Sequence, residues 1–171
     1  MNVDLSHQST KSILFNKIEA ELIKDGYQIV RKDFNRPWGG FFAMDEAQTA
    51  KFIEQFFPHL SVESVINGQK LSPKILVVAP QKRLSWQYHF RRSEVWIVEQ
   101  GEVGVVRSTT DEQGEVEQLK KGDHVTLAKG ERHRLVGLEN WGIVAEIWQH
   151  TDPNQPSDED DIVCLQDDFG R

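Results

Sequence analysis

Residues 84–94 read LSWQYHFRRSE, and this stretch carries the clearest indication of how the chain folds. Its first half has the composition of a β-strand, in which residues two apart point to the same face, so Gln87 and His89 are expected to project together. Glu94 lies beyond a short polar turn and can face the same space from the next strand. His133 lies in a later β-rich run, after a glycine-containing turn.

These four side chains have the chemistry of a metal site. Gln87, His89, Glu94 and His133 offer two imidazole nitrogens, one carboxylate and one amide oxygen. This mixed set suits one divalent metal ion. Zn²⁺ is the preferred ion, with Mn²⁺, Fe²⁺, Co²⁺ and Ni²⁺ as alternatives. For a single histidine, ordinary packing is the more frequent explanation. Here the ligand types and the spacing agree over four positions, which favours metal binding.

The chain after residue 74 reads as short strands separated by turns. Strands are predicted at 74–79, 84–89, 94–100, 102–107, 115–119, 123–127, 132–136 and 142–149, a pattern typical of a sandwich or barrel.

The part before residue 58 has a different character. Helices are predicted at 12–24 and 45–57, the second with a capping box of Asp45 and Gln48. A strand is predicted at 27–34 and a turn at 35–40. We therefore expect one domain over 1–171. It would comprise a helical N-terminal extension with a leading strand (1–58), a β-barrel (74–150) and an acidic tail that packs back on the barrel (151–171).

Two ordered motifs add a family resemblance. They are Gln87-x-His89-x4-Glu94-x6-Gly101 and Gly122-x5-Ala128-x-Gly130-x2-His133. In order and spacing they resemble the two signature motifs of cupins, His-x-His-x(3,4)-Glu-x6-Gly and Gly-x5-Pro-x-Gly-x2-His-x3-Asn. The chain departs from them at Gln87, Ala128 and Gly137. The resemblance implies an all-β core, a single cupin (jelly-roll) double-stranded β-barrel with N-terminal helical additions.

A narrower resemblance is to the cupin domain of type II mannose-6-phosphate isomerases. Four fragments carry it in order: RPWG at 36–39, QYHFRRSEVW at 87–96, GERHRL at 130–135, and EDDIV at 159–163 with DFGR at 168–171. It implies that Gln87, His89, Glu94 and His133 hold the metal. It also implies an enzyme, a metal-dependent aldose–ketose isomerase that converts mannose 6-phosphate to fructose 6-phosphate through an enediolate. No Gly-rich nucleotide loop precedes the predicted barrel.

A sugar phosphate would need cationic partners, for which the bidentate guanidinium of Arg suits better than Lys. The candidates are Arg36, Arg92, Arg134 and Arg171. Arg92 and Arg134 are favoured because each is close in sequence to a motif residue, although Arg134, next to His133 on a strand, would face the opposite way. The general base of this reaction stays open among Asp160, Asp161, Glu131 and Lys129, with metal-bound hydroxide as another option.

Composition limits the classes of function. The formal net charge of −7 over 171 residues lacks the basic footprint of a nucleic-acid-binding protein. The single cysteine, Cys164, excludes an internal disulfide. There is neither a signal-peptide core nor a stretch of roughly 18 apolar residues that a membrane helix needs. We expect a cytoplasmic protein whose partner is a small-molecule sugar phosphate, with a homodimer as a further expectation.

Three other functions fit the same motifs, because one fold serves many chemistries. The first is a non-catalytic cupin that binds metal or sugar, for example as a sensor. The second is a metal-dependent oxygenase, against which Gln87 in place of a histidine argues mildly. The third is a barrel without metal, which metal analysis of the purified protein would detect.

Overall fold

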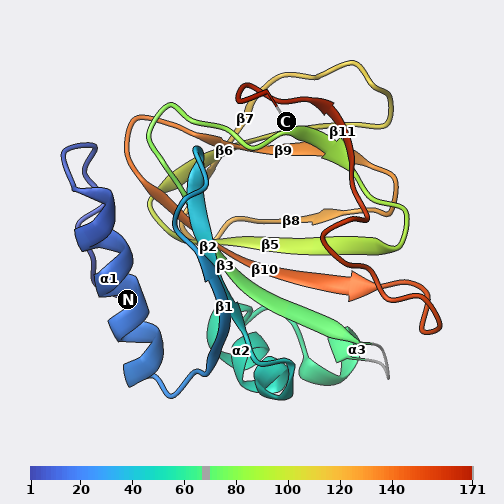
Figure 1. The fold of residues 1–171 in the computed structure, drawn as a ribbon. Helices are drawn as coiled ribbons and strands as arrows, with labels where there is room; N and C mark the ends of the chain where they lie inside the picture. Colours follow the sequence, from blue (N-terminus) through green and yellow to red (C-terminus); the bar gives the residue numbers. More distant parts are fainter. Residues whose placement is uncertain (67–69, 171) are drawn as a thin grey trace.

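The computed structural model describes residues 1–66 and 70–170 and folds them into two antiparallel β-sheets with helices at one side (Figure 1). The helices are α1 (Lys11–Lys24), the 3-10 helix η1 (Glu46–Gln48), α2 (Thr49–Phe56) and α3 (Val62–Ile66). The strands are β1 (Ile29–Asp33), β2 (Gly39–Met44), β3 (Leu71–Val78), β4 (Trp86–Tyr88), β5 (Arg92–Gln100), β6 (Glu102–Ser108), β7 (Glu117–Lys120), β8 (His124–Leu127), β9 (Arg132–Gly137), β10 (Gly142–His150) and β11 (Val163–Gln166).

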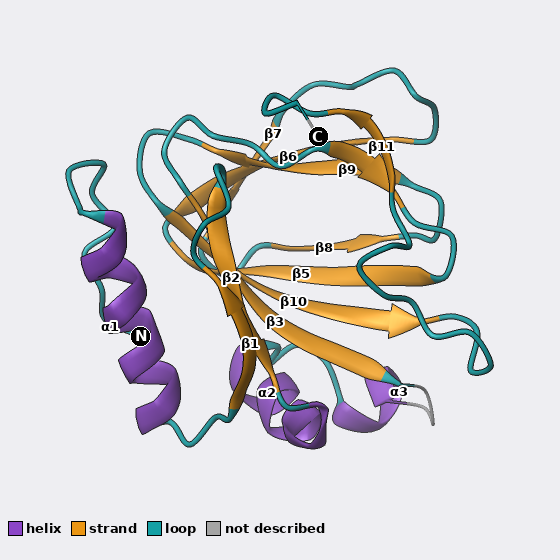
Figure 2. Cartoon of the chain, in the orientation of Figure 1, coloured by secondary structure: helices purple, strands orange, loops and turns teal. Residues whose placement is uncertain are grey.

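The strand order makes a jelly roll. One sheet has the order β1-β2-β3-β10-β5-β8 and the other β11-β4-β9-β6-β7. From β3 to β11 the chain passes repeatedly from one sheet to the other, and the sheets enclose the barrel interior between them (Figure 2). This confirms the predicted all-β cupin fold with N-terminal helical additions. Among the described helices, none is long and apolar enough to cross a membrane.

Two hydrophobic cores lie on the two faces of the six-stranded sheet. Leu76 and Val78 of β3 point into the barrel, while Ile75 and Val77 point outward toward the helices. The outer core receives Leu14, Ile18 and Leu22 of α1, which recur every four residues along one helix face. Because both faces of β3 are covered, its second half, residues 75–78, is a continuous apolar run rather than an alternating one.

Several predicted boundaries need correction. The expected turn at 35–40 is shorter, because β2 begins at Gly39 and adds a strand to the sheet. Gly39 has a φ of +142°, and a Cβ there would lie 1.9 Å from the carbonyl oxygen of Val77, so close pairing of β2 with β3 requires glycine. Strand β11 and helix α3 were not predicted, and the barrel sheets include β1 and β2.

The predicted capping box at the second helix is half right. Asp45 Oδ1 accepts a hydrogen bond from the amide of Ala47 at 2.9 Å, which caps η1. Gln48 instead bonds outward, to the amide of Gln28 and the carbonyl of Gly26. The side chain thereby ties the second helical segment to the start of β1, a contact that no local pattern encodes.

Replacing Asp45 by alanine is expected to lower the free energy of unfolding by about 1 kcal/mol, because the amide of Ala47 loses its acceptor. Urea denaturation followed by circular dichroism measures this, with the exposed Asp160→Ala in the tail as the control. An unchanged stability of the Asp45 variant would mean that the cap contributes nothing.

Candidate metal centre

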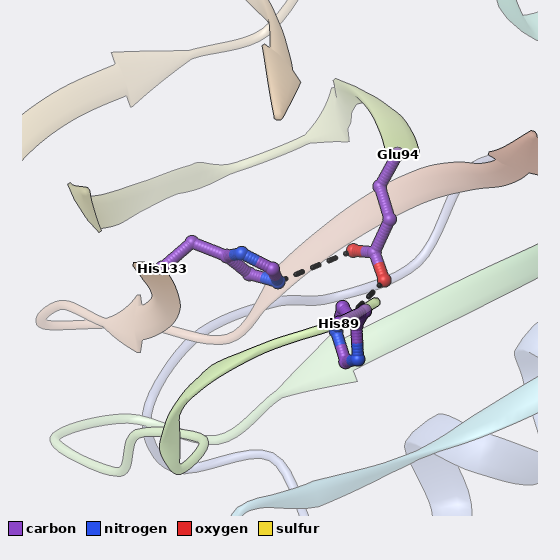
Figure 3. Close-up of side chains that lie close together, drawn as sticks. All are labelled: His89, Glu94 and His133. Atoms are coloured by element: carbon purple, nitrogen blue, oxygen red, sulfur yellow. Dashed lines mark ion pairs between the residues drawn. The ribbon is translucent and has the colours of Figure 1, made fainter. Parts of the chain in front are cut away.

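The four predicted ligands come from strands of both sheets. Gln87 on β4 and His133 on β9 are direct partners across the five-stranded sheet, and His89 follows β4 by one residue. Glu94 lies on β5 in the six-stranded sheet. Closure of the barrel brings this carboxylate opposite the histidines, and Figure 3 shows His89, Glu94 and His133 pointing toward one another.

The carboxylate of Glu94 bridges the two imidazoles. Its Oε1 lies 3.2 Å from His89 Nε2 and its Oε2 lies 3.5 Å from His133 Nε2 (Figure 3). Each of the three side chains is only 2% exposed. In the part of the chain that the structure describes, this is the one group of three His, Cys, Asp or Glu side chains whose ligand atoms lie within 4.8 Å of one another.

The Nδ1 hydrogen bonds of the two histidines leave each Nε2 facing the carboxylate of Glu94, where His89 Nε2 also accepts a hydrogen bond from Arg92 Nη2 at 3.1 Å. His89 Nδ1 donates to the carbonyl oxygen of Asp161 at 2.6 Å, and His133 Nδ1 donates to that of Glu131 at 2.9 Å. A carbonyl can only accept, so in each neutral ring Nε2 carries the lone pair. His133 Nε2 is buried and lacks a hydrogen-bond partner, which an ordinary packing role leaves unexplained. The donor set therefore fits one divalent metal ion.

Gln87 lies beside this cluster with its amide nitrogen nearer to it. Its Nε2 is 3.5 Å from His89 Nε2, while its Oε1 accepts from Ser85 Oγ at 2.5 Å. Turning the amide would present the oxygen, because the two ends of an amide are nearly equal in shape. A role for Gln87 as fourth ligand stays a prediction.

Arg92 is the buried counter-charge of the centre. Its Nε donates to Glu94 Oε1 at 2.8 Å, its Nη2 lies 3.1 Å from His89 Nε2, and its Nη1 donates to Ser157 Oγ at 3.0 Å. Burial by itself raises the pKa of Glu94, but the Arg92 guanidinium and the two imidazoles hold that pKa well below its ordinary value. Glu94 is therefore ionised at neutral pH.

Of the four predicted substrate arginines, Arg36 and Arg92 line the pocket beside the cluster. Arg36 is at the same time paired with Asp33, at 2.8 Å. Arg134 is 1% exposed and donates to the carbonyl of Leu84 and to Gln113 Oε1. Strand alternation turns it away from His133, so its placement does not support a role in the pocket. Arg171 lies outside the described residues.

The pocket itself is small and mixed in character. Its volume is about 210 Å³, and its walls include Trp38, Phe41, Trp96 and Trp148. A larger cavity of about 640 Å³ near Trp141 contains none of the candidate ligands, and we give it no part in the metal chemistry.

Two charged residues in this pocket were missed from the sequence, Glu146 on β10 and Lys74 on β3, which are direct cross-strand partners. Burial raises the pKa of Glu146 to about 8, and the nearby Glu94 carboxylate adds to this. Trp96 Nε1 donates to both Glu94 Oε2 and Glu146 Oε1, each at 3.0 Å. A lone charged residue within an apolar strand run was the signal that could have identified both residues.

The C-terminal tail supports the histidine segment. Asp161 accepts from the amides of Phe90 and Arg91 at 2.9 and 3.0 Å, while its own carbonyl holds His89. Asp161→Ala is therefore expected to weaken metal affinity by about 10- to 100-fold. A competition titration with a chelating dye measures this, with the exposed neighbour Asp160→Ala as control. Equal affinities for the two variants would contradict the supporting role.

Comparison with known proteins agrees with the observed fold and identifies the family of this chain. A family model described as "Mannose-6-phosphate isomerase C-terminal" matches residues 45–167. A mannose-1-phosphate guanylyltransferase of Salmonella montevideo is 27% identical over 143 residues, covering 84% of this chain and 24% of the relative. The xanthan biosynthesis protein XanB of Xanthomonas campestris pv. campestris (strain B100) is 32% identical over 114 residues, covering 67% and 23%. The chain spans about a quarter of the length of these relatives.

Among solved structures, vicilin from Solanum lycopersicum has a TM-score of 0.51 and 18% identity, covering 78% of this chain and 33% of that chain. At this identity the likeness concerns the fold alone. It agrees with the two-sheet barrel described above.

The relatives overturn the predicted reaction. They are named as a guanylyltransferase and a polysaccharide biosynthesis protein, not as isomerases, and they share only a domain with this chain. The prediction that the chain converts mannose 6-phosphate to fructose 6-phosphate is therefore wrong. The physical reason is that ligand spacing predicts a metal centre, while one barrel and one donor set serve many reactions. The coarser statement stands, that the chain shares its domain with enzymes of mannose phosphate chemistry.

Proposed function

The chain belongs to the Mannose-6-phosphate isomerase C-terminal family, and from this premise we propose that it is a metal-holding cupin module that binds a sugar phosphate of the mannose series. The observation that carries the proposal is the buried cluster of His89, Glu94 and His133, with the partnerless Nε2 of His133 turned toward a carboxylate.

Within this proposal the three clustered side chains would hold the ion, with Gln87 as a candidate fourth ligand. A divalent ion bound there supplies a Lewis-acidic positive charge for sugar oxygens. Arg92 neutralises Glu94 and orients it through the 2.8 Å hydrogen bond to Oε1. Zn²⁺ remains the preferred ion on the donor set of nitrogen and carboxylate ligands.

The pocket supports a small polar ligand. Its volume of about 210 Å³ is below the roughly 300–1,000 Å³ of pockets that hold drug-sized molecules. Trp38 offers apolar surface, and Arg36 offers a cation at the wall. A hexose phosphate combines a compact polar ring with a dianion. The ring suits the small volume of the pocket, and the dianion suits the cation at its wall. The homodimer and the cytoplasmic location stay predictions.

The test measures metal and ligand separately. Purified protein is analysed for metal content, and calorimetry then follows binding of mannose 1-phosphate, mannose 6-phosphate and mannose, with Zn²⁺ or with EDTA. We expect about one ion per chain and tighter binding of a sugar phosphate than of mannose, with affinity reduced by EDTA. Protein that takes up no divalent ion, or that binds neither sugar phosphate when loaded, would contradict the proposal.

A further inference from the structure

Three cationic side chains outside the metal centre gather around the ring of Phe41. Arg31 Cζ lies 5.0 Å, Lys74 Nζ 5.2 Å and Arg36 Cζ 5.8 Å from the ring centroid. They come from β1, from β3 and from the turn before β2. Like charges at this spacing repel one another, so an anion among them is electrostatically favoured.

The anion in this place is the carboxylate of Glu159 from the C-terminal tail. Its Oε1 accepts a hydrogen bond from Lys74 Nζ at 2.7 Å and forms an ion pair with Arg31 Nη2. The Lys74 side chain is 7% exposed, whereas that of Glu159 is 45% exposed. The lysine is thus fixed within the fold, while its partner is open to solvent and can be displaced.

Glu159 stands where two cavities meet. Lys74, Trp148 and Glu159 line both the 210 Å³ pocket and a neighbouring cavity of about 260 Å³, which Arg31 also lines. The Trp148 ring lies 3.4 Å from Lys74 Nζ and 3.6 Å from Arg92 Cζ. Because Arg92 in turn contacts His89, one aromatic side chain connects the cationic group to the metal centre.

We propose that Arg31, Arg36 and Lys74 form the phosphate subsite of this pocket, and that Glu159 occupies it until the phosphate of the ligand displaces the carboxylate. The inference rests on the proposed function for the identity of the ligand as a sugar phosphate. A phosphate monoester carries about −1.5 to −2 charges and three acceptor oxygens, against one charge on Glu159. Lys74 and Arg31, with Arg36 beside them in its ion pair with Asp33, therefore match the phosphate better than the single carboxylate.

Displacement of the Glu159 carboxylate would also affect the metal centre, because the same tail segment contacts Arg92 and the segment of His89. Ser157 and the carbonyl of Asp158 hold Arg92, and Asp161 holds the segment of His89. Phosphate binding at one end of this segment and metal binding at the other would thereby be mechanically connected, with Glu159 as the group that changes partners.

The test is a calorimetric titration of the EDTA-treated chain, residues 1–171, with inorganic phosphate and with mannose 6-phosphate. Glu159→Gln is expected to tighten binding of both about tenfold, because it removes the competing negative charge. Lys74→Met and Arg31→Gln are expected to weaken binding, the first by about tenfold or more. Glu115→Gln, an exposed change of the same kind distant in sequence, should behave as wild type.

Unchanged or weaker phosphate binding in Glu159→Gln would overturn the inference, as would unaltered binding in folded Lys74→Met. Arg31→Gln keeps the test valid if the buried lysine variant fails to fold, since the Arg31 side chain is 49% exposed. The outcome is separate from that of the proposed function. A wild-type chain that takes up no metal contradicts that function, while the titration in EDTA still reports on the phosphate subsite.

Discussion

Replacing His133 by alanine is expected to lower the affinity of the chain for Zn²⁺ by at least about a hundredfold. The change removes one of two imidazole nitrogens from a buried donor set, a larger loss than the roughly 10- to 100-fold typical of a supporting residue. The wild-type protein should gain about 2.7 kcal/mol of stability at a Zn²⁺ concentration of 100 times its Kd, and the variant should gain no more than about 0.4 kcal/mol at that concentration. Competition with a zinc chelator and thermal melts measure both effects.

His124→Ala is the matched control for this experiment. His124 lies on β8, which pairs with β5, is exposed, and stacks on His59 with ring centroids 3.8 Å apart. Its loss should leave metal affinity unchanged. A His133 variant with wild-type affinity, or an equal loss in the His124 variant, would mean that the ion is bound elsewhere.

The second large effect concerns Glu146 and pH. Burial raises the pKa of this carboxyl to about 8, above its ordinary value of 4.5. Between these values the unfolded chain has released the proton while the folded chain retains it, so metal-free protein should lose stability as pH rises from about 5 to 8. At about 1.4 kcal/mol per pKa unit the loss amounts to a few kcal/mol. Glu146→Gln should abolish most of it.

Urea denaturation in EDTA at several pH values between 5 and 8.5 measures this slope. Glu115→Gln, on an exposed loop, should keep the wild-type dependence. If wild type and Glu146→Gln show parallel curves, Glu146 ionises in the folded chain much as it does in water, and the buried protonated carboxyl is excluded.

Local patterns accounted for much of the fold. The spacing of Leu14, Ile18 and Leu22 predicted α1 to within one residue at its start, since helix periodicity is expressed over a few residues. The strand β2 escaped prediction because its first residues read as a turn. Its pairing with β3 depends on a close approach at Gly39 that only the partner strand explains.

For the candidate metal centre, too, local patterns predicted one part and the tertiary structure supplied the rest. Period-two alternation put Gln87 and His89 on one side of the chain, and motif spacing added Glu94 and His133. The structure brings three of these within ligand distance of one another and Gln87 beside them. Neither pattern could identify the reaction, because the ligand atoms indicate that a metal ion is bound and do not indicate which substrate is converted.

The sequence by itself determined the all-β cupin class, the helix α1 and the clustered histidines and glutamate, because strand alternation, helix periodicity and motif spacing are properties of neighbouring residues. Only the tertiary structure decided that Arg92 and Arg36 line the pocket, and that Glu159 meets Lys74. Barrel closure and the return of the tail bring together residues 85 positions apart. Contacts at that separation depend on how whole sheets pack, which no short stretch of sequence specifies.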